Sequence, residues 1–174
     1  SYAFKECINL ESATIGSSVA TIGINPFVGC SKLTNITFET NEYFKYKNGT
    51  IMTKDEKELI TYLQTNNETT FVSPSNELKV IRPYAFYGNN KLEIVSISSN
   101  VDSIREYAFS NCSSLKKVYN LKTNNEIFTT NVFSGCNNLM NMYVREKYTG
   151  NTGSGINVGG INMIVTKMTN NETN

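Results

Sequence analysis

The sequence contains no histidine and no tryptophan among its 174 residues, and it has only three prolines and four cysteines. Histidine is the commonest general base in enzymes and the commonest imidazole ligand of metals. Its absence excludes serine–histidine–aspartate and cysteine–histidine catalysis within this sequence. We therefore expect a chain that is not an enzyme, with no catalytic residues, no metal site and no cofactor.

Net charge and long apolar runs are also lacking. Sixteen lysines and arginines stand against fifteen aspartates and glutamates, a balance that does not favour nucleic acid or an anionic membrane as a main ligand. The sequence has no run of about 18 apolar residues, so we expect no membrane insertion of this chain. Its first residues lack the charged-then-apolar layout of a secretion signal.

What the sequence does contain is a repeated unit with a period of about 23 residues. A phenylalanine, usually preceded by alanine, is followed three residues later by cysteine or asparagine and then by leucine and a β-branched run. The phenylalanines of the five units are Phe4, Phe27, Phe86, Phe109 and Phe133. A fixed period of this length is typical of a solenoid, whose units bury their apolar faces only by stacking.

Each unit predicts a short strand. Leu92, Val95 and Ile97 show the alternation of a strand with one buried face. A second apolar pair lies eight and five residues before the phenylalanine, as Val101 and Ile104 do before Phe109. We therefore expect a mainly β leucine-rich-repeat solenoid with a parallel ladder of strands and few short helical turns.

The spacing between Phe27 and Phe86 is much longer than one period, so the sequence between them contains one period plus an insertion. The insertion falls at about residues 39–70. Asn48-Gly49 separates two runs of aromatic and β-branched residues there, which is the strongest short pattern for a hairpin. We expect a small antiparallel meander that bulges from the solenoid.

The repeat changes at both ends of the chain. Residues 1–4 match residues 106–109, so the chain starts in the middle of a unit and is expected to be a fragment of a longer solenoid. One residue is inserted in the last unit, which places Phe128 at the position of Ile104.

We expect the solenoid over residues 1–148 and a Gly- and Asn-rich cap over residues 149–174. The cap is expected to contain one strand at 161–168 and a disordered tail.

The four cysteines, Cys7, Cys30, Cys112 and Cys136, share one position of the unit. Disulfides Cys7–Cys30 and Cys112–Cys136 are conceivable, because equivalent positions of stacked coils lie about 5 Å apart. Parallel side-chain directions oppose bridging, and free cysteine is among the most buried residue types. We therefore favour buried thiols. The cysteines of each pair lie a full period apart, which is unlike the short ligand spacing of a zinc site.

Two segments could suggest ligand sites, but a turn is the better interpretation of each. The glycines between 150 and 160 are not followed by Gly-Lys-Ser/Thr and have no strand-to-helix context, as a phosphate site would need. The charged run at 54–58 lacks the alternating acidic ligands and the glycine of a calcium loop.

These units resemble the BspA-like leucine-rich repeat family, whose unit is close to Leu-x-x-Ile-x-Ile-Pro-x-x-Val-x-x-Ile-x-x-x-Ala-Phe-x-x-Cys. The resemblance covers residues 3–38 and 72–144, with Pro26 for alanine and Asn89 for cysteine as departures. It implies a secreted or cell-surface protein, often an adhesin that binds host matrix or another cell, and it does not imply an enzyme.

The outward residues of the strand ladder are the candidate partner-binding site, because solenoids bind partners on the extended surface of repeated strands. The candidates are Thr14, Asn35, Thr37, Ser96, Lys117, Tyr119, Asn141, Tyr143 and Arg145. Tyrosine and arginine are enriched at binding hot spots, which favours the tyrosines and their basic neighbours. The alternative is that threonine and tyrosine simply suit exposed strand positions.

The expected function is a non-catalytic protein-interaction or adhesion segment of a secreted or cell-surface protein. The alternative is an intracellular protein–protein interaction scaffold, which free cysteines in a reducing compartment would suit.

Overall fold

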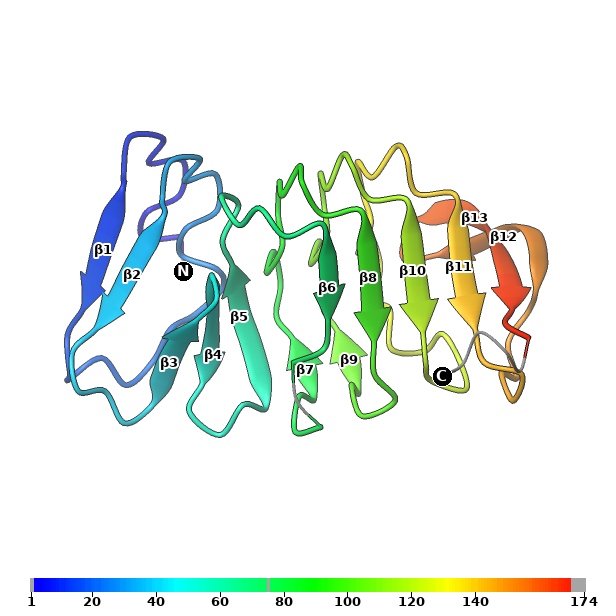
Figure 1. Cartoon of the computed structure of the whole chain (residues 1–174), viewed down its shortest axis with the longest axis horizontal. Coiled ribbons are helices and arrows are strands. Elements are labelled where there is room, and N and C mark those ends of the chain that lie inside the picture. The colour runs from blue at the N-terminus through cyan, green and yellow to red at the C-terminus, as the bar shows by residue number, and fades with distance from the viewer. Residues whose placement is uncertain (1, 75, 170–174) are drawn as a thin grey trace.

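The computed structural model describes residues 2–74 and 76–169, which form a stack of coils elongated along one axis (Figure 1). Thirteen strands and no helix are present in these residues. They are β1 (Ser12–Ile15), β2 (Asn35–Phe38), β3 (Phe44–Lys47), β4 (Thr50–Thr53), β5 (Glu58–Tyr62), β6 (Thr70–Val72), β7 (Val80–Ile81), β8 (Ile94–Ile97), β9 (Ser103–Ile104), β10 (Lys117–Asn120), β11 (Asn141–Val144), β12 (Gly153–Val158) and β13 (Ile161–Lys167). The few helical turns expected from the sequence are replaced by hydrogen-bonded turns.

A six-stranded sheet covers one side of the stack, in the order β12-β13-β11-β10-β8-β6. Strands β6, β8, β10, β11 and β13 run parallel, and only β12 is antiparallel to its neighbour. Lys117 of β10 pairs with Ile94 of β8 and with Asn141 of β11, which hold the equivalent positions of the preceding and following units. The predicted parallel ladder and register are therefore confirmed for β8, β10 and β11, whereas β1 and β2, expected in the same ladder, form a separate sheet.

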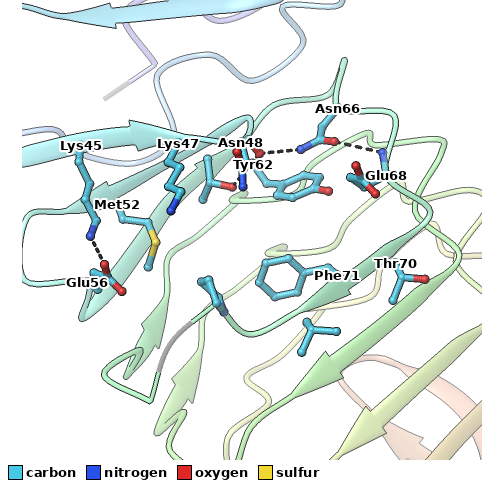
Figure 2. Close-up of a pocket in the computed structure, with 13 residues that line it drawn as sticks. Lys45, Lys47, Asn48, Met52, Glu56, Tyr62, Asn66, Glu68, Thr70 and Phe71 are labelled. Atoms are coloured by element: carbon cyan, nitrogen blue, oxygen red, sulfur yellow. Dashed lines mark hydrogen bonds and ion pairs between the residues drawn. The ribbon is translucent and has the colours of Figure 1, made fainter.

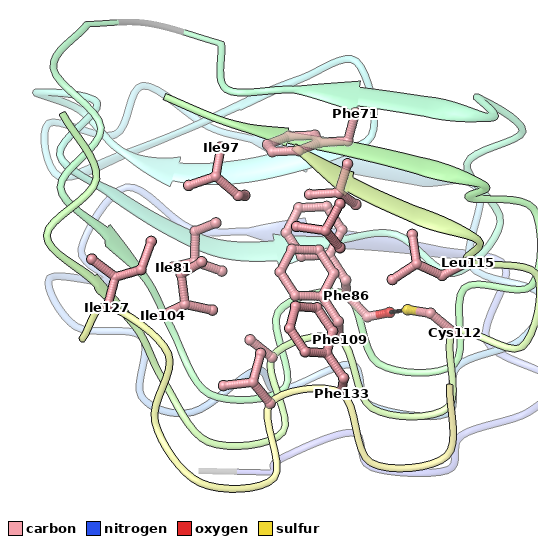
Figure 3. Close-up of a cluster of buried hydrophobic side chains, with 14 of the residues drawn as sticks. Phe71, Ile81, Phe86, Ile97, Ile104, Phe109, Cys112, Leu115, Ile127 and Phe133 are labelled. Atoms are coloured by element: carbon pink, nitrogen blue, oxygen red, sulfur yellow. Dashed lines mark hydrogen bonds between the residues drawn. The ribbon is translucent and has the colours of Figure 1, made fainter. Parts of the chain in front are cut away.

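The ladder forms because alternate side chains of each strand enter the core. Val95, Ile97, Val118 and Met142 have no exposed surface. Figure 3 shows the rings of Phe86, Phe109 and Phe133 stacked one above the other beneath these strands. Their centroids are 4.4 Å apart between the first two rings and 5.7 Å apart between the last two. The repeated phenylalanine thus joins successive coils through aromatic contact.

Hydrogen bonds between coils explain the cysteine position. Three thiols donate to the carbonyl oxygen of a phenylalanine in the preceding coil: Cys30 to Phe4 (3.0 Å), Cys112 to Phe86 (3.2 Å) and Cys136 to Phe109 (3.0 Å). All four cysteines are free, and these three are buried as predicted. Burial raises the pKa of the Cys112 thiol. Cys7 is exposed, contrary to the prediction, because among the described residues only the coil that follows packs against its own.

The predicted meander is present as β3, β4 and β5, which pair antiparallel. Asn48 and Gly49 form the two-residue turn between β3 and β4, with φ angles of 50° and 72°. These positive angles match a type I′ turn, which Asn-Gly favours.

The expectation that the meander bulges from the solenoid is wrong. β5 pairs parallel with β7, so the meander lies within a five-stranded sheet, β3-β4-β5-β7-β9.

The meander divides the apolar interior in two. Ile51, Ile60 and Leu63 contribute to a smaller cluster with residues of the first two coils. Met52 and Leu59 contribute to a larger cluster that extends through the later coils. Because both faces of the meander are covered, its strands carry buried side chains in succession rather than in alternation.

The last coils are more regular than the sequence suggests. Phe128 forms a parallel bridge with Ile104 as predicted, although Ile127, at 4% exposed, supplies the buried side chain. The strand expected at 161–168 is β13. The Gly-rich stretch before it, interpreted as turns, contains strand β12, and Gly159-Gly160 makes the turn between them. Of residues 169–174, expected to be disordered, 170–174 lie outside the described residues.

Candidate interaction surface

The register of the six-stranded sheet aligns outward side chains in two rows. We call the first the tyrosine row; it consists of Val72, Ser96, Tyr119, Tyr143 and Thr166. The flanking row consists of Thr70, Ile94, Lys117, Asn141 and Ile164. Both rows lie on the face opposite the core, because strand side chains alternate between the two faces.

Tyr119 and Tyr143 form an ordered aromatic pair at the centre of this surface. Their ring centroids are 5.1 Å apart with an interplanar angle of 22°. The Lys117 ammonium lies 6.0 Å from the centroid of the Tyr143 ring, at the limit of a cation–π contact. Both rings are partly exposed, while Val118 and Met142 beside them in sequence are fully buried. The backbone under the pair is therefore anchored by the core.

The remaining candidates extend the surface around this pair. Ser96 lies next to Tyr119 in the tyrosine row, and Asn141 lies next to Lys117 in the flanking row. Arg145 directly follows β11 and is exposed. Tyrosine, basic and amide side chains are thus brought together over β8, β10 and β11.

Three candidates lie elsewhere. Thr14, Asn35 and Thr37 belong to β1 and β2, which form a separate two-stranded sheet. The meander follows β2 along the chain, and the next strand of the ladder is β6, in the other sheet (Figure 1). The nine predicted residues therefore form two groups: five on the large sheet together with Arg145 directly after it, and three on the small sheet.

Sequence reasoning missed the apolar ends of the two rows. Val72 is 63% exposed and Ile164 is 45% exposed. Val72 lies one repeat before its partner Ser96, and Ile164 lies one repeat after its partner Asn141. The repeat period alone could therefore have found both.

A cavity of about 540 Å³ lies where the meander meets the six-stranded sheet. Lys45, Lys47 and Met52 line it from the meander, and Phe71 lines it from β6 (Figure 2). Burial, and secondarily the charge of Glu68, raises the pKa of Tyr62 to about 12. The sequence did not predict this cavity, because it depends on how the meander packs.

The side chains of the two rows and of the cavity do not form a metal-binding site. Within residues 2–74 and 76–169, no three histidine, cysteine, aspartate or glutamate side chains are grouped so that they could hold a metal ion. The same part of the chain contains no helix that could cross a membrane.

The structure is a leucine-rich-repeat solenoid. Each coil is one repeat, the strands of successive coils form a parallel ladder, and leucine recurs at a fixed position. The model of the BspA type leucine rich repeat region matches residues 1–51 and 58–156, in six copies. The chain belongs to this family. No curated protein matches it.

Three similar solved structures are bacterial. A leucine-rich repeat protein from Eubacterium ventriosum has a TM-score of 0.63 and 20% identity, over 91% of this chain and 48% of its own. The pneumococcal vaccine antigen PcpA has a TM-score of 0.62 and 21% identity, over 91% and 42%. A leucine rich cell surface protein from Faecalibacterium prausnitzii has a TM-score of 0.62 and 21% identity, over 93% and 49%. The chain spans less than half the length of each, and at this identity they share its fold.

Proposed function

We propose that this chain is a non-catalytic protein-interaction segment of a secreted or cell-surface leucine-rich repeat protein. It binds a partner protein through the outward face of β8, β10 and β11. The observation that carries this proposal is the stacked pair of Tyr119 and Tyr143, held in place beside Lys117 on a sheet whose other face is core.

The geometry suits binding without chemistry. A stacked tyrosine pair offers a large amphipathic contact area and has few rotamers to lose, so it binds at low entropic cost. Lys117 beside the Tyr143 ring and Arg145 directly after β11 add positive charge to this surface, which favours an acidic patch on the partner. Asn141 and Ser96 supply hydrogen-bonding groups around the aromatic centre.

The family and its structural relatives support placement at the cell surface. One similar structure is described as a vaccine antigen and another as a cell surface protein. We extend this location to the present chain and propose adhesion to host matrix or to another cell-surface protein as its role. Thr14, Asn35 and Thr37 on the β1–β2 sheet are proposed as a secondary contact area.

The test is a binding screen of the purified chain against extracellular-matrix proteins and solubilised cell-surface proteins. For any partner found, Tyr119→Ala with Tyr143→Ala is expected to weaken binding by at least about 30-fold, the loss typical of a hot spot. The melting temperature should stay nearly unchanged, because both side chains lie outside the core.

Thr14→Ala with Thr37→Ala is the comparison variant, since it also removes two outward side chains of neighbouring strands, but in the secondary contact area. We expect it to weaken binding by no more than about threefold, as for residues outside a hot spot. Unimpaired binding of the tyrosine double variant would contradict the proposed site.

An intracellular scaffold is the second candidate, and the four free cysteines favour it, because reduced thiols are typical of reducing compartments. A signal peptide or an anchor in the flanking gene sequence would eliminate this candidate, whereas the tyrosine surface would serve either role.

A further inference from the structure

One edge of the six-stranded sheet is unpaired at β6. This strand is last in the sheet order and pairs only with β8. The Ile94 N–H donates to the Thr69 carbonyl (3.0 Å), and the Ser73 N–H donates to the Ser96 carbonyl (3.1 Å). In a parallel ladder alternate residues bond to the same neighbour, so the N–H and C=O groups of Thr70 and Val72 point away from β8.

These backbone groups border the cavity described above. Thr70, Phe71, Val72 and Pro74 line one side of the cavity, and residues of β3 and β4 line the other. Met52, Tyr62 and Phe71, each no more than 6% exposed, supply an apolar floor. A volume of about 540 Å³ lies within the range of pockets that hold drug-sized ligands. The site thus combines free backbone pairing groups with an apolar surface below them.

Some charged side chains around the cavity form an ion pair and others do not. Lys45 and Glu56 form an ion pair with each other. Lys47 and Glu68 have no ion-pair partner within the described parts of the chain. Figure 2 shows Lys47 on the side of Met52, and Glu68 on the side where β6 begins at Thr70. The cavity therefore presents a cation and an anion at different places along the strand edge.

We propose that the β6 edge accepts an extended segment of a partner protein as an additional parallel strand. The segment alternates apolar and polar side chains, with the apolar ones directed onto Met52, Tyr62 and Phe71. It carries a basic residue near its start, facing Glu68, and an acidic residue near its end, facing Lys47. Main-chain hydrogen bonds to Thr70 and Val72 supply affinity, and the side chains supply specificity, as in other strand-addition complexes. This site is distinct from the tyrosine row.

The probe is a capped eight-residue peptide that alternates valine and threonine, with lysine at its first position and glutamate at its last. Titration into the labelled chain, followed by NMR, is expected to show saturable binding at micromolar to millimolar peptide. Amide exchange at Thr70 and Val72 should slow by at least about tenfold, since their N–H groups become hydrogen-bonded. A peptide N-methylated at alternate amides, so that it loses the donors that face β6, should bind about tenfold more weakly or not at all.

Charge reversal in both molecules tests the orientation without disturbing the fold. Lys47→Glu with Glu68→Lys should weaken binding of the probe peptide by about tenfold. The same variant should bind the peptide whose two charged ends are exchanged.

Val72→Pro removes the N–H that faces the cavity and should weaken binding by about tenfold, whereas Val72→Thr should not. Tyr119→Ala with Tyr143→Ala should leave peptide binding unchanged, so that failure here is separate from failure of the proposed function.

Three results would overturn the inference. The first is the absence of saturable binding, and the second is binding that leaves the amides of Thr70 and Val72 unprotected. The third is slowing of the same amides when the protein concentration is raised without peptide, which would assign the edge to a second copy of this chain.

Discussion

Asn89 and the cysteines show how one position of the coil accepts different chemistry. The Asn89 amide donates to the carbonyls of Leu63 (3.3 Å) and Asn66 (3.3 Å), in the preceding coil. Its oxygen also accepts from the N–H groups of Lys91 (3.0 Å) and Leu92 (2.8 Å). A cysteine thiol at this position donates to a phenylalanine carbonyl of the preceding coil, as Cys112 does to Phe86. Asparagine therefore replaces cysteine without loss of the contact between coils.

Asn89→Ala is expected to destabilise the protein by about 1–3 kcal/mol, because buried donors and acceptors lose their partners. Asn89→Cys should lose less stability than Asn89→Ala, since the thiol can restore the hydrogen bond to the preceding coil. Urea unfolding of the three proteins would measure the difference. Equal stability of the alanine variant and the parent would contradict the role assigned to this side chain.

The phenylalanine positions could be predicted from the sequence, because their period is strict and each ring is buried by the stacking of coils. The backbone conformation at Tyr84 and Tyr107 could not be predicted. Both tyrosines have positive φ angles, 58° and 57°, which bulky side chains rarely adopt. Their rings stack at 5.1 Å, and this contact exists only once the coils are assembled. Local propensity therefore gave no indication of it.

Among the elements, the meander also has a feature that depends on the assembled stack and could not be predicted from local sequence. Asn48-Gly49 predicted its first turn, because only a few residues accept two successive positive φ angles. The parallel pairing of Glu58 with Val80 joins the meander to the coil that follows it and depends on the whole stack. The sequence therefore predicted a meander but placed it outside the solenoid. The cavity beside β6 was missed for the same reason.

Gly49→Ala tests the turn that begins the meander. At a φ of 72° the added Cβ is strained, and it would also lie 2.5 Å from the Asn66 amide nitrogen. We expect a loss of about 1–2 kcal/mol in the free energy of unfolding. Gly16→Ala is the matched control, because its Cβ would meet only the Glu39 carboxylate at 3.6 Å. Its effect should stay within about 0.5 kcal/mol. Equal effects of the two substitutions in denaturant unfolding would contradict this account.

At the scale of the whole molecule, the two apolar clusters are joined by polar contacts as well as by the meander. Asn25, at 3% exposed, donates to the Tyr84 carbonyl (2.8 Å), and its oxygen accepts from the Thr61 hydroxyl (2.9 Å). The second coil is thereby attached to a coil that lies beyond the insertion. Coils before and after the insertion thus form one stack.

Phe109→Ala removes the middle ring of the phenylalanine column and is expected to cost about 3–5 kcal/mol, because the cavity lies in a fully buried layer. Phe4→Ala, where the ring is 40% exposed at the end of the stack, should cost clearly less. Thermal melts of both variants would check the order. A melt of Phe109→Ala that matched the parent would contradict the stacked core.

We propose that function lies on the outward tyrosine row, while the repeated positions hold the fold. Cross-saturation NMR tests it most directly, with magnetisation transferred from a bound partner to the labelled chain. We predict the strongest transfer at the ring protons of Tyr119 and Tyr143, with weaker transfer at Thr14 and Thr37. Strong transfer to Tyr84 and Tyr107 on the turns, with none at Tyr119 and Tyr143, would contradict the claim.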